Sequence, residues 1–156
     1  MRLDAQEVAK RLGPELTIAS DNAPGLCVVA GPHEAVAKLE AALTADEVVC
    51  RALHTSHAFH SAMMDEAIEP FAEHVRAVAL DEPRIPFVST VSGTWIRAEE
   101  ALSPEYWARH LRETVRFREG IATLLADSGR ALLEVGPRGT LATLARRGRG
   151  LHLVRS

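Results

Sequence analysis

Three histidines, His54, His57 and His60, recur at every third position of one short segment and are the side chains best suited to chemistry. His60 lies at the start of an expected helix among small and aromatic neighbours, which suits a general base that takes a proton from a nucleophile. Nowhere before His60 does the chain contain a Gly-x-Ser-x-Gly turn, the usual setting of a nucleophilic serine. The residue types therefore indicate one part of a site for nucleophilic catalysis: the general base is in this chain and the nucleophile is not.

The same histidines raise the question of a metal site, and their spacing argues against one. In a strand, residues i and i+3 point to opposite faces, and in a helix the step from i to i+6 rotates too far for three ligands to converge. We therefore expect no bound metal. On spacing alone, three ordinary surface or partly buried histidines remain an open alternative to the catalytic interpretation.

Composition places the chain among soluble globular proteins. Its 156 residues suffice for one ordinary domain or two small lobes, and 47% are apolar while 25% are charged. A net charge of −3 gives no general attraction to nucleic acid or to anionic membranes. Cys27 and Cys50 lie in apolar runs and are expected to be buried, reduced thiols. With no apolar stretch of about 20 residues and no signal peptide, we expect a cytoplasmic protein.

The first third of the chain predicts a small unit of helices and strands. Asp4 can cap the amide of Glu7, and Gly13-Pro14 ends the helix that follows Asp4. The elements expected next are strand 16–20, turn 21–25, strand 26–30, helix 33–43 and strand 47–53. This order matches a ferredoxin-like unit without its first strand, which indicates that the natural domain extends upstream of Met1.

After His60 the pattern predicts alternating helices and strands. Apolar residues at helical spacing cover 64–78, where Pro70 should kink or restart the helix. The elements expected beyond it are strand 86–91, a helix capped by Ser103-Pro104-Glu105, helix 117–126, strand 131–135 and helix 140–147. Such alternation is typical of an α/β layer with parallel strand pairing.

One segment around His60 carries a family resemblance. The run Thr55-Ser56-His57-Ala58-Phe59-His60-Ser61-Ala62-Met63-Met64-Asp65 closely resembles a signature of the acyltransferase domains of modular polyketide synthases. Further matches follow in the family's order: Asn22-Ala23-Pro24-Gly25, Cys27-Val28-Val29-Ala30-Gly31-Pro32, Ile85-Pro86-Phe87-Val88-Ser89-Thr90, Tyr106-Trp107, Leu111-Arg112-Glu113, Val115-Arg116-Phe117 and Leu133-Glu134-Val135-Gly136-Pro137. The resemblance runs from about Leu16 to Arg147 and covers only the C-terminal half of the family's domain.

The resemblance implies an activity and roles for four residues. In the family, an acyl group passes from coenzyme A to a serine and then to the phosphopantetheine thiol of an acyl carrier protein, and no bound cofactor is expected. His60 matches the catalytic base of the Ser-His dyad, and a backbone carbonyl near Glu113 matches the acceptor that orients its ring. Malonyl-selective members resemble the pattern His57-Ala58-Phe59-His60. Phe59 and His57 are therefore selectivity candidates with malonyl-CoA as substrate, and a plain core aromatic is the alternative for Phe59.

The resemblance also implies what this chain needs from a partner. The family's nucleophilic serine, one oxyanion-hole donor and the arginine that binds the malonyl carboxylate precede Met1, so the missing N-terminal half of the domain is an expected partner beside the carrier protein. The chain is then expected to be inactive alone. The alternative is a non-catalytic docking module that binds an acyl carrier protein.

The expected fold class is α/β, in three parts. Residues 1–54 form an incomplete ferredoxin-like small lobe, residues 55–147 supply the C-terminal strands and helices of an α/β-hydrolase-like acyltransferase lobe, and residues 148–156 are a tail or linker. A basic cluster of Arg138, Arg146, Arg147 and Arg149 is interpreted as a solvated face near a helix C-terminus. Contact with an acidic carrier protein is the alternative for this cluster.

Overall fold

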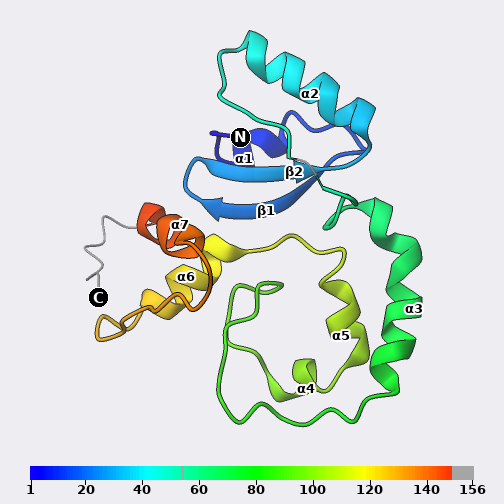
Figure 1. The fold of residues 1–156 in the computed structure, drawn as a ribbon, viewed down its shortest axis with the longest axis vertical. Coiled ribbons are helices and arrows are strands. Elements are labelled where there is room, and N and C mark those ends of the chain that lie inside the picture. The colour runs from blue at the N-terminus through cyan, green and yellow to red at the C-terminus, as the bar shows by residue number, and fades with distance from the viewer. Residues whose placement is uncertain (54, 149–156) are drawn as a thin grey trace.

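The computed structural model describes residues 1–53 and 55–148 (Figure 1). His54 of the histidine segment, Arg149 of the basic cluster and the expected tail beyond residue 148 lie outside the described residues. Within the described part, no helix is long and apolar enough to cross a membrane.

The N-terminal part is built on one antiparallel hairpin. Its elements are α1 (Ala5–Ala9), β1 (Thr17–Ala23), β2 (Leu26–Ala30) and α2 (His33–Ala45). The tight turn at Pro24-Gly25 is confirmed, but β1 runs to Ala23, three residues further than predicted. Asp4 does cap α1, although its carboxylate accepts from the amide of Gln6 instead of that of Glu7.

The predicted third strand over 47–53 is wrong. The described part of this segment is irregular, and its chain is held by single backbone bonds from Arg2 to Val49 and from Val48 to Leu43. Val49 and Leu53 are exposed. A strand needs a neighbouring strand to pair with, and the described sheet holds only β1 and β2.

The C-terminal part is mainly helical. Its elements are the 3-10 turn η1 (Ala62–Met64), α3 (Asp65–Arg76), α4 (Ala98–Ala101), α5 (Pro104–Arg109), α6 (Phe117–Leu125) and α7 (Thr140–Gly148). The predicted cap at Ser103 is confirmed, because its hydroxyl accepts from the amide of Tyr106. Of the kink or restart predicted at Pro70, the restart does not occur, since α3 continues through this proline, which cannot donate a backbone hydrogen bond.

The strands predicted at 86–91 and 131–135 are also absent as regular elements of the described chain. The first makes one isolated antiparallel bridge, Val88 to Trp95, and the second has no ladder. The parallel layer expected from the alternation is reduced to a single bridge between Ser20 and Val115. The physical reason is the same as for residues 47–53: strands of apolar sequence cannot form a ladder without partners.

Contacts of helices with β1 and with one another position the site (Figure 1). Helix α1 packs against β1, α6 and α7 pack against β1 from another side, and α3 packs along α5. Val8, Cys27 and Leu43 are fully buried around the hairpin. Burial raises the pKa of the Cys27 thiol. Cys50 is half-buried, and both cysteines are free in the described structure. The site described below lies where the hairpin meets the helical part.

Gly93 allows the turn after Ser89 to pack closely on α6. Its φ of 73° lies in the left-handed region, and a Cβ built there would lie 2.6 Å from Glu119 Cβ. Gly93→Ala is therefore expected to lower the free energy of unfolding by about 2 kcal/mol. Gly25 is the matched control, because its φ of 65° is similar and an added Cβ meets no atom within 4 Å. Denaturant titration should show that Gly25→Ala lowers the free energy of unfolding by only about 1 kcal/mol. Equal decreases for the two variants would contradict the close packing of Gly93 on α6.

Candidate functional site

His60 is held by two backbone carbonyls of the turn that follows α5. Its amide donates to the carbonyl of Leu111 at 2.8 Å, and its ring Nδ1 lies 2.8 Å from the carbonyl oxygen of Glu113. A carbonyl can only accept, so Nδ1 carries the proton. In the neutral ring Nε2 then carries the lone pair, and the hydrogen bond of the ring to a described residue is the one made by Nδ1. This is the arrangement of a general base.

The backbone of His60 is strained in a way that the sequence did not reveal. Its φ of 62° lies in the left-handed region, which costs a residue with a Cβ about 1–2 kcal/mol. Such conformations persist where surrounding contacts hold them, and they concentrate at functional sites. Here the two bonds to the 111–113 turn hold both the backbone and the ring.

Ser61 shapes the loop that carries His60 and is no nucleophile. It is fully buried, its hydroxyl donates to the carbonyl of Ala58 at 2.6 Å, and it accepts from the amide of Met63. The hydroxyl proton is thus used within the loop, and the hydroxyl oxygen caps η1. Ser56 pairs instead with Nδ1 of His57 at 3.1 Å. Neither serine is hydrogen-bonded to the His60 ring.

Strand β1 anchors the turn that holds His60. The Thr114 hydroxyl donates to the carbonyl of Ile18 at 2.6 Å, and backbone bonds join Val115 to Ala19 and Asp21, each at 2.9 Å. These bonds follow Glu113 directly, so the carbonyl that contacts His60 is tied to the sheet. The sheet therefore positions the candidate base through a turn more than 90 residues later in the sequence.

Arg118 secures this anchor from α6. Its guanidinium lies 2.7 Å from Asp21 Oδ2 and 3.0 Å from Asp4 Oδ2, and all three side chains are at least half covered. Burial raises the pKa of Asp21, against which Arg118 acts to lower it. The pKa of Asp4 is lowered, first by the Gln6 amide and also by Arg118. One cation thus joins α1, β1 and α6.

A second histidine, His110, lies beside His60 and was missed from the sequence. Its ring stacks on Trp107 with centroids 5.7 Å apart and meets the edge of Tyr106 at 5.0 Å. Burial lowers the pKa of His110, and the charges of His60 and Arg109 lower it further. The Tyr106-Trp107 motif, three residues earlier, was the available signal.

Phe59 and His57 lie beside the candidate base, as their sequence positions require. Their rings are 5.9 Å apart and tilted by 58°. Phe59 keeps 44% of its surface exposed, so in this chain it is not the plain core aromatic of the alternative interpretation. Glu113, the fourth candidate, contributes its backbone carbonyl to His60 while its carboxylate lies 3.9 Å from Arg109. The structure thus joins the candidates in two pairs, His60 with Glu113 and His57 with Phe59, on neighbouring positions of one loop.

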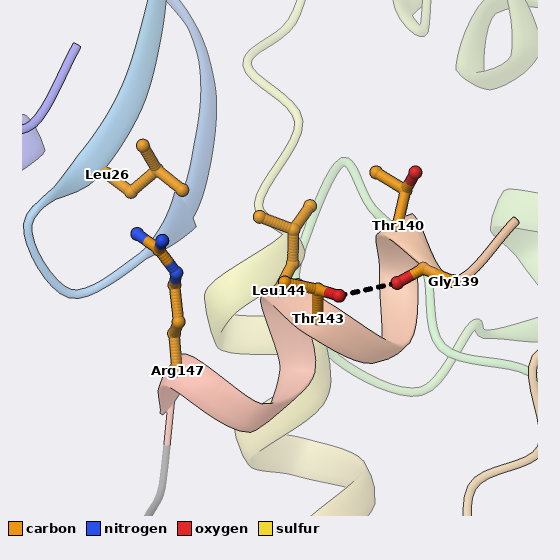
Figure 2. Close-up of a pocket in the computed structure, with 6 residues that line it drawn as sticks. All are labelled: Leu26, Gly139, Thr140, Thr143, Leu144 and Arg147. Atoms are coloured by element: carbon orange, nitrogen blue, oxygen red, sulfur yellow. Dashed lines mark hydrogen bonds between the residues drawn. The ribbon is translucent and has the colours of Figure 1, made fainter.

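Other parts of the described chain offer no competing site of this kind. No three His, Cys, Asp or Glu side chains of residues 1–53 and 55–148 gather as a metal site. A pocket of about 380 Å³ lies between β2 and α7, where Figure 2 shows Arg147 reaching toward Leu26 and the Thr143 hydroxyl bonded to Gly139. Arg146 and Arg147 are exposed in the last turn of α7, as expected for a solvated basic face. None of the residues around His60 lines this pocket.

Comparison with known proteins identifies the family. The model of the acyl transferase domain matches residues 1–151, and this chain belongs to that family. Among relatives, a phenolphthiocerol/phthiocerol polyketide synthase protein of Mycobacterium tuberculosis is 34% identical over 93% of this chain, which spans 10% of that protein. The chain therefore spans only a small part of the curated relatives it matches.

Solved structures agree with this assignment. The acyltransferase domain of SpnD, solved in complex with a 2-(pent-4-yn-1-yl)malonyl group, is 41% identical with a TM-score of 0.90; the match covers 94% of this chain and 36% of that one. The malonyl-CoA:ACP transacylase of Synechocystis sp. PCC 6803 is 28% identical with a TM-score of 0.78, covering 95% of this chain and 50% of that one. The mixed α/β arrangement of this chain is thus that of polyketide-synthase acyltransferase domains.

Proposed function

We infer that this chain supplies the catalytic base of a malonyl-CoA:acyl-carrier-protein acyltransferase of polyketide biosynthesis. The observation that carries the proposal is the hydrogen bond between His60 Nδ1 and the Glu113 carbonyl, which leaves Nε2 free to accept a proton. The nucleophilic serine belongs to the part of an acyltransferase domain that this chain does not span. On this proposal the chain is inactive alone.

In the proposed chemistry the same ring nitrogen, Nε2 of His60, first accepts a proton and then returns it. Nε2 of His60 takes the proton of the serine hydroxyl as the serine oxygen attacks the thioester carbonyl of malonyl-CoA. The carbon–sulfur bond breaks, and the imidazolium returns the proton to the departing thiolate. The phosphopantetheine thiol of the carrier protein then loses its proton to Nε2 and attacks the serine ester. The ester carbon–oxygen bond breaks, and the imidazolium returns the proton to the serine oxygen. The Glu113 carbonyl keeps the Nδ1 proton in place throughout, and no cofactor is consumed.

The proposed domain boundaries follow the same family pattern. We assign residues 1–54 to a ferredoxin-like small lobe without its first strand and residues 55–147 to the end of the larger α/β-hydrolase-like lobe. The hairpin β1–β2 with α1 and α2 supports the first assignment, and the structural likeness to the SpnD domain over 94% of the chain supports the arrangement as a whole. His60 then belongs to the second lobe, close to its junction with the first.

Mass spectrometry with malonyl-CoA tests the proposal. The chain is incubated alone and together with the remaining residues of the SpnD acyltransferase domain, which this chain matches at 41% identity. A malonyl mass shift on the added part, dependent on the presence of this chain, is the expected result. A shift on this chain alone would contradict the proposal. Carrier-protein binding without acylation in either mixture would favour the docking module.

Phe59 is proposed to limit the size of the acyl group. Its ring lies 5.9 Å from the ring of His57, and Phe59 directly precedes His60 in the chain. On this proposal the ring takes the space that an α-methyl branch of the acyl group would need. Phe59→Ser is therefore expected to raise methylmalonyl loading relative to malonyl loading by about 10-fold, since one methyl group in a pocket is worth about 1–3 kcal/mol. Competition between the two coenzyme A thioesters in the complete domain measures this ratio. His57→Ala, which removes the neighbouring ring, is the variant for comparison. An unchanged ratio of methylmalonyl to malonyl loading in Phe59→Ser would show that Phe59 does not limit the size of the acyl group.

A further inference from the structure

An ion pair joins the two segments that hold the candidate base. Arg112 Nε donates to Asp65 Oδ1 at 2.7 Å, across 47 positions of the sequence. Arg112 lies between Leu111 and Glu113, whose carbonyls bind the amide and the ring of His60. Asp65 is the first residue of α3 and follows His60 closely in the chain. The ion pair therefore connects the same two segments as the hydrogen bonds of His60 do.

The segment from His60 to Asp65 is one short hydrogen-bonded turn. The hydroxyl of the buried Ser61 accepts from the amide of Met63, and the amide of Met64 donates to the Ser61 carbonyl at 3.0 Å. The turn η1 then leads directly into α3. A force on the side chain of Asp65 is therefore expected to move the backbone of His60.

The turn on the other side of the ion pair is equally compact. The amides of Arg112 and Glu113 both donate to the carbonyl of Arg109, at 3.0 and 2.8 Å. The next residue, Thr114, is bonded to β1 through its hydroxyl. The position of the Arg112 side chain is therefore coupled to the position of the Glu113 carbonyl, which faces the ring of His60.

The hydrogen bond of the His60 ring depends on the exact placement of these two segments. Its Nδ1 lies 2.8 Å from the Glu113 carbonyl oxygen, and hydrogen bonds weaken steeply when their geometry is lost. The backbone of His60, with its φ of 62°, also keeps its conformation only where surrounding contacts hold it. A shift of the Glu113 carbonyl would release the ring, whose proton could then lie on either nitrogen.

We propose that Asp65 and Arg112 are positioning residues whose ion pair keeps the Glu113 carbonyl against the ring of His60. The inference rests on the proposed function, because the pair acts in the reaction only if His60 is the base. Within the described residues, each of the two side chains is the other's ion-pair partner, and that of Arg112 is only 34% exposed. A hydrogen bond between two charged groups is shorter and stronger than one between neutral groups.

Hydrogen exchange of the His60 amide in this chain tests the inference. Arg112→Met removes the guanidinium, and the amide that donates to Leu111 is then expected to exchange about 5-fold faster, the upper range for a partly exposed ion pair. In nitrogen NMR at alkaline pH, the same variant should move part of the proton of the neutral His60 ring from Nδ1 to Nε2. A loss of overall stability would not by itself change this tautomer.

Arg76→Met is the matched control. Arg76 also joins α3 to α5, through Glu105 at 2.8 Å, and its side chain is 41% exposed. Because it lies at the far end of α3, its loss should change the exchange of the His60 amide by less than about 2-fold and leave the tautomer unchanged. Arg112→Lys keeps the charge and can still reach Asp65 with one hydrogen bond. Exchange in Arg112→Lys should therefore stay within about 2-fold of the unaltered chain.

A second pair of variants serves if Arg112→Met does not fold. Asp65→Asn and Glu105→Gln each remove a carboxylate charge from the first turn of a helix, and the two carboxylate side chains are 56% and 59% exposed. Asp65→Asn is expected to make the His60 amide exchange about 3-fold faster, and Glu105→Gln should change it by less than about 2-fold.

Three results would overturn the inference. The first is a His60 amide whose exchange and ring tautomer are the same in Arg112→Met as in the unaltered chain. The second is an equal change in Arg112→Met and Arg76→Met, or in Asp65→Asn and Glu105→Gln. The third is an Arg112→Lys variant that behaves like Arg112→Met.

The failure of this inference can be told apart from the failure of the proposed function. Hydrogen exchange and nitrogen NMR report the position of His60 and require no catalysis, whereas the malonyl mass shift does. If acylation did not depend on His60, the proposed function would be refuted even if Arg112→Met released the ring. If acylation depended on His60 while Arg112→Met left the ring in place, the function would stand and the positioning role of the ion pair would be refuted.

Discussion

Replacing His60 with asparagine is expected to lower the rate of acyl-enzyme formation by about 10³-fold in a complete acyltransferase domain containing this chain, within the range for a lost general base. The loss follows from removing the nitrogen that takes the serine proton. Stopped mixing with malonyl-CoA followed by mass spectrometry measures the rate.

Asparagine is chosen because His60 has a φ of 62°. Asparagine tolerates the left-handed region better than most residues, so the loop is expected to keep its conformation. His60→Ala should lose as much activity as His60→Asn, and its loop should be less stable. His33→Gln, at an exposed position at the start of α2, is the control and should stay within about 3-fold of the unaltered rate, because it removes no proton acceptor of the reaction. An asparagine variant that retains the unaltered rate would show that His60 is not the base.

Arg118→Met is expected to lower the free energy of unfolding by about 3 kcal/mol at pH 7, the low end for breaking a covered ion pair. Asp21 is then left largely covered with its charge uncompensated, and Asp4 loses its long-range partner. Arg116→Met is the matched control. The ion pair of Arg116 with Glu119 is about half exposed on both sides, so its loss should cost no more than about 0.5 kcal/mol.

The effect of Arg118→Met should depend on pH in a defined direction. Burial raises the pKa of Asp21 above its ordinary value of 3.8, so the folded state is penalised more as pH rises and Asp21 ionises. Loss of Arg118 raises the pKa of Asp21 further. The pKa of Asp4 is lowered, so its stabilising contribution is present above 3.8 and is lost as pH falls through its folded value. The difference in unfolding free energy between variant and unaltered chain should therefore narrow as pH falls, first above pH 3.8 as Asp21 takes up its proton and then below pH 3.8 as Asp4 does.

Denaturant titrations at neutral and acidic pH measure this gap. If the difference in unfolding free energy between the variant and the unaltered chain does not change with pH, Arg118 stabilises the fold by packing and not through Asp4 and Asp21. Arg118 joins α1, β1 and α6. In the variant, the backbone amides of the turn that carries Glu113 should therefore exchange their hydrogens faster.

Local signals made the helices predictable and long-range pairing made the strands unpredictable. The Ser103 cap and the apolar spacing of residues 117–126 are contained within a few positions, and both helices are present. Residues 86–91 and 131–135 carry strand-like composition, but a strand forms only beside a partner. The apolar composition of residues 131–135 therefore predicted a strand that the described chain does not form, because no partner strand lies beside this segment there.

In the candidate site, too, local features could be predicted from the sequence and long-range contacts could not. The segment around His60 is recognisable because its residues are consecutive, and the carbonyl of Glu113 could be located through a second motif. The left-handed backbone of His60, the neighbouring His110 and the anchoring by Arg118 depend on contacts between distant segments. No spacing within one segment encodes such contacts.

Nitrogen NMR of the isotope-labelled imidazoles tests the central claim most directly, because it reads the tautomer of His60 in this chain without a partner or substrate. At alkaline pH, where the ring is neutral, the account predicts a proton on Nδ1, bonded to the Glu113 carbonyl, and a lone pair on Nε2. His60→Asn identifies the signal by its loss. A neutral His60 with its proton on Nε2 would contradict the account, since that ring could not accept the proton of a serine from this side.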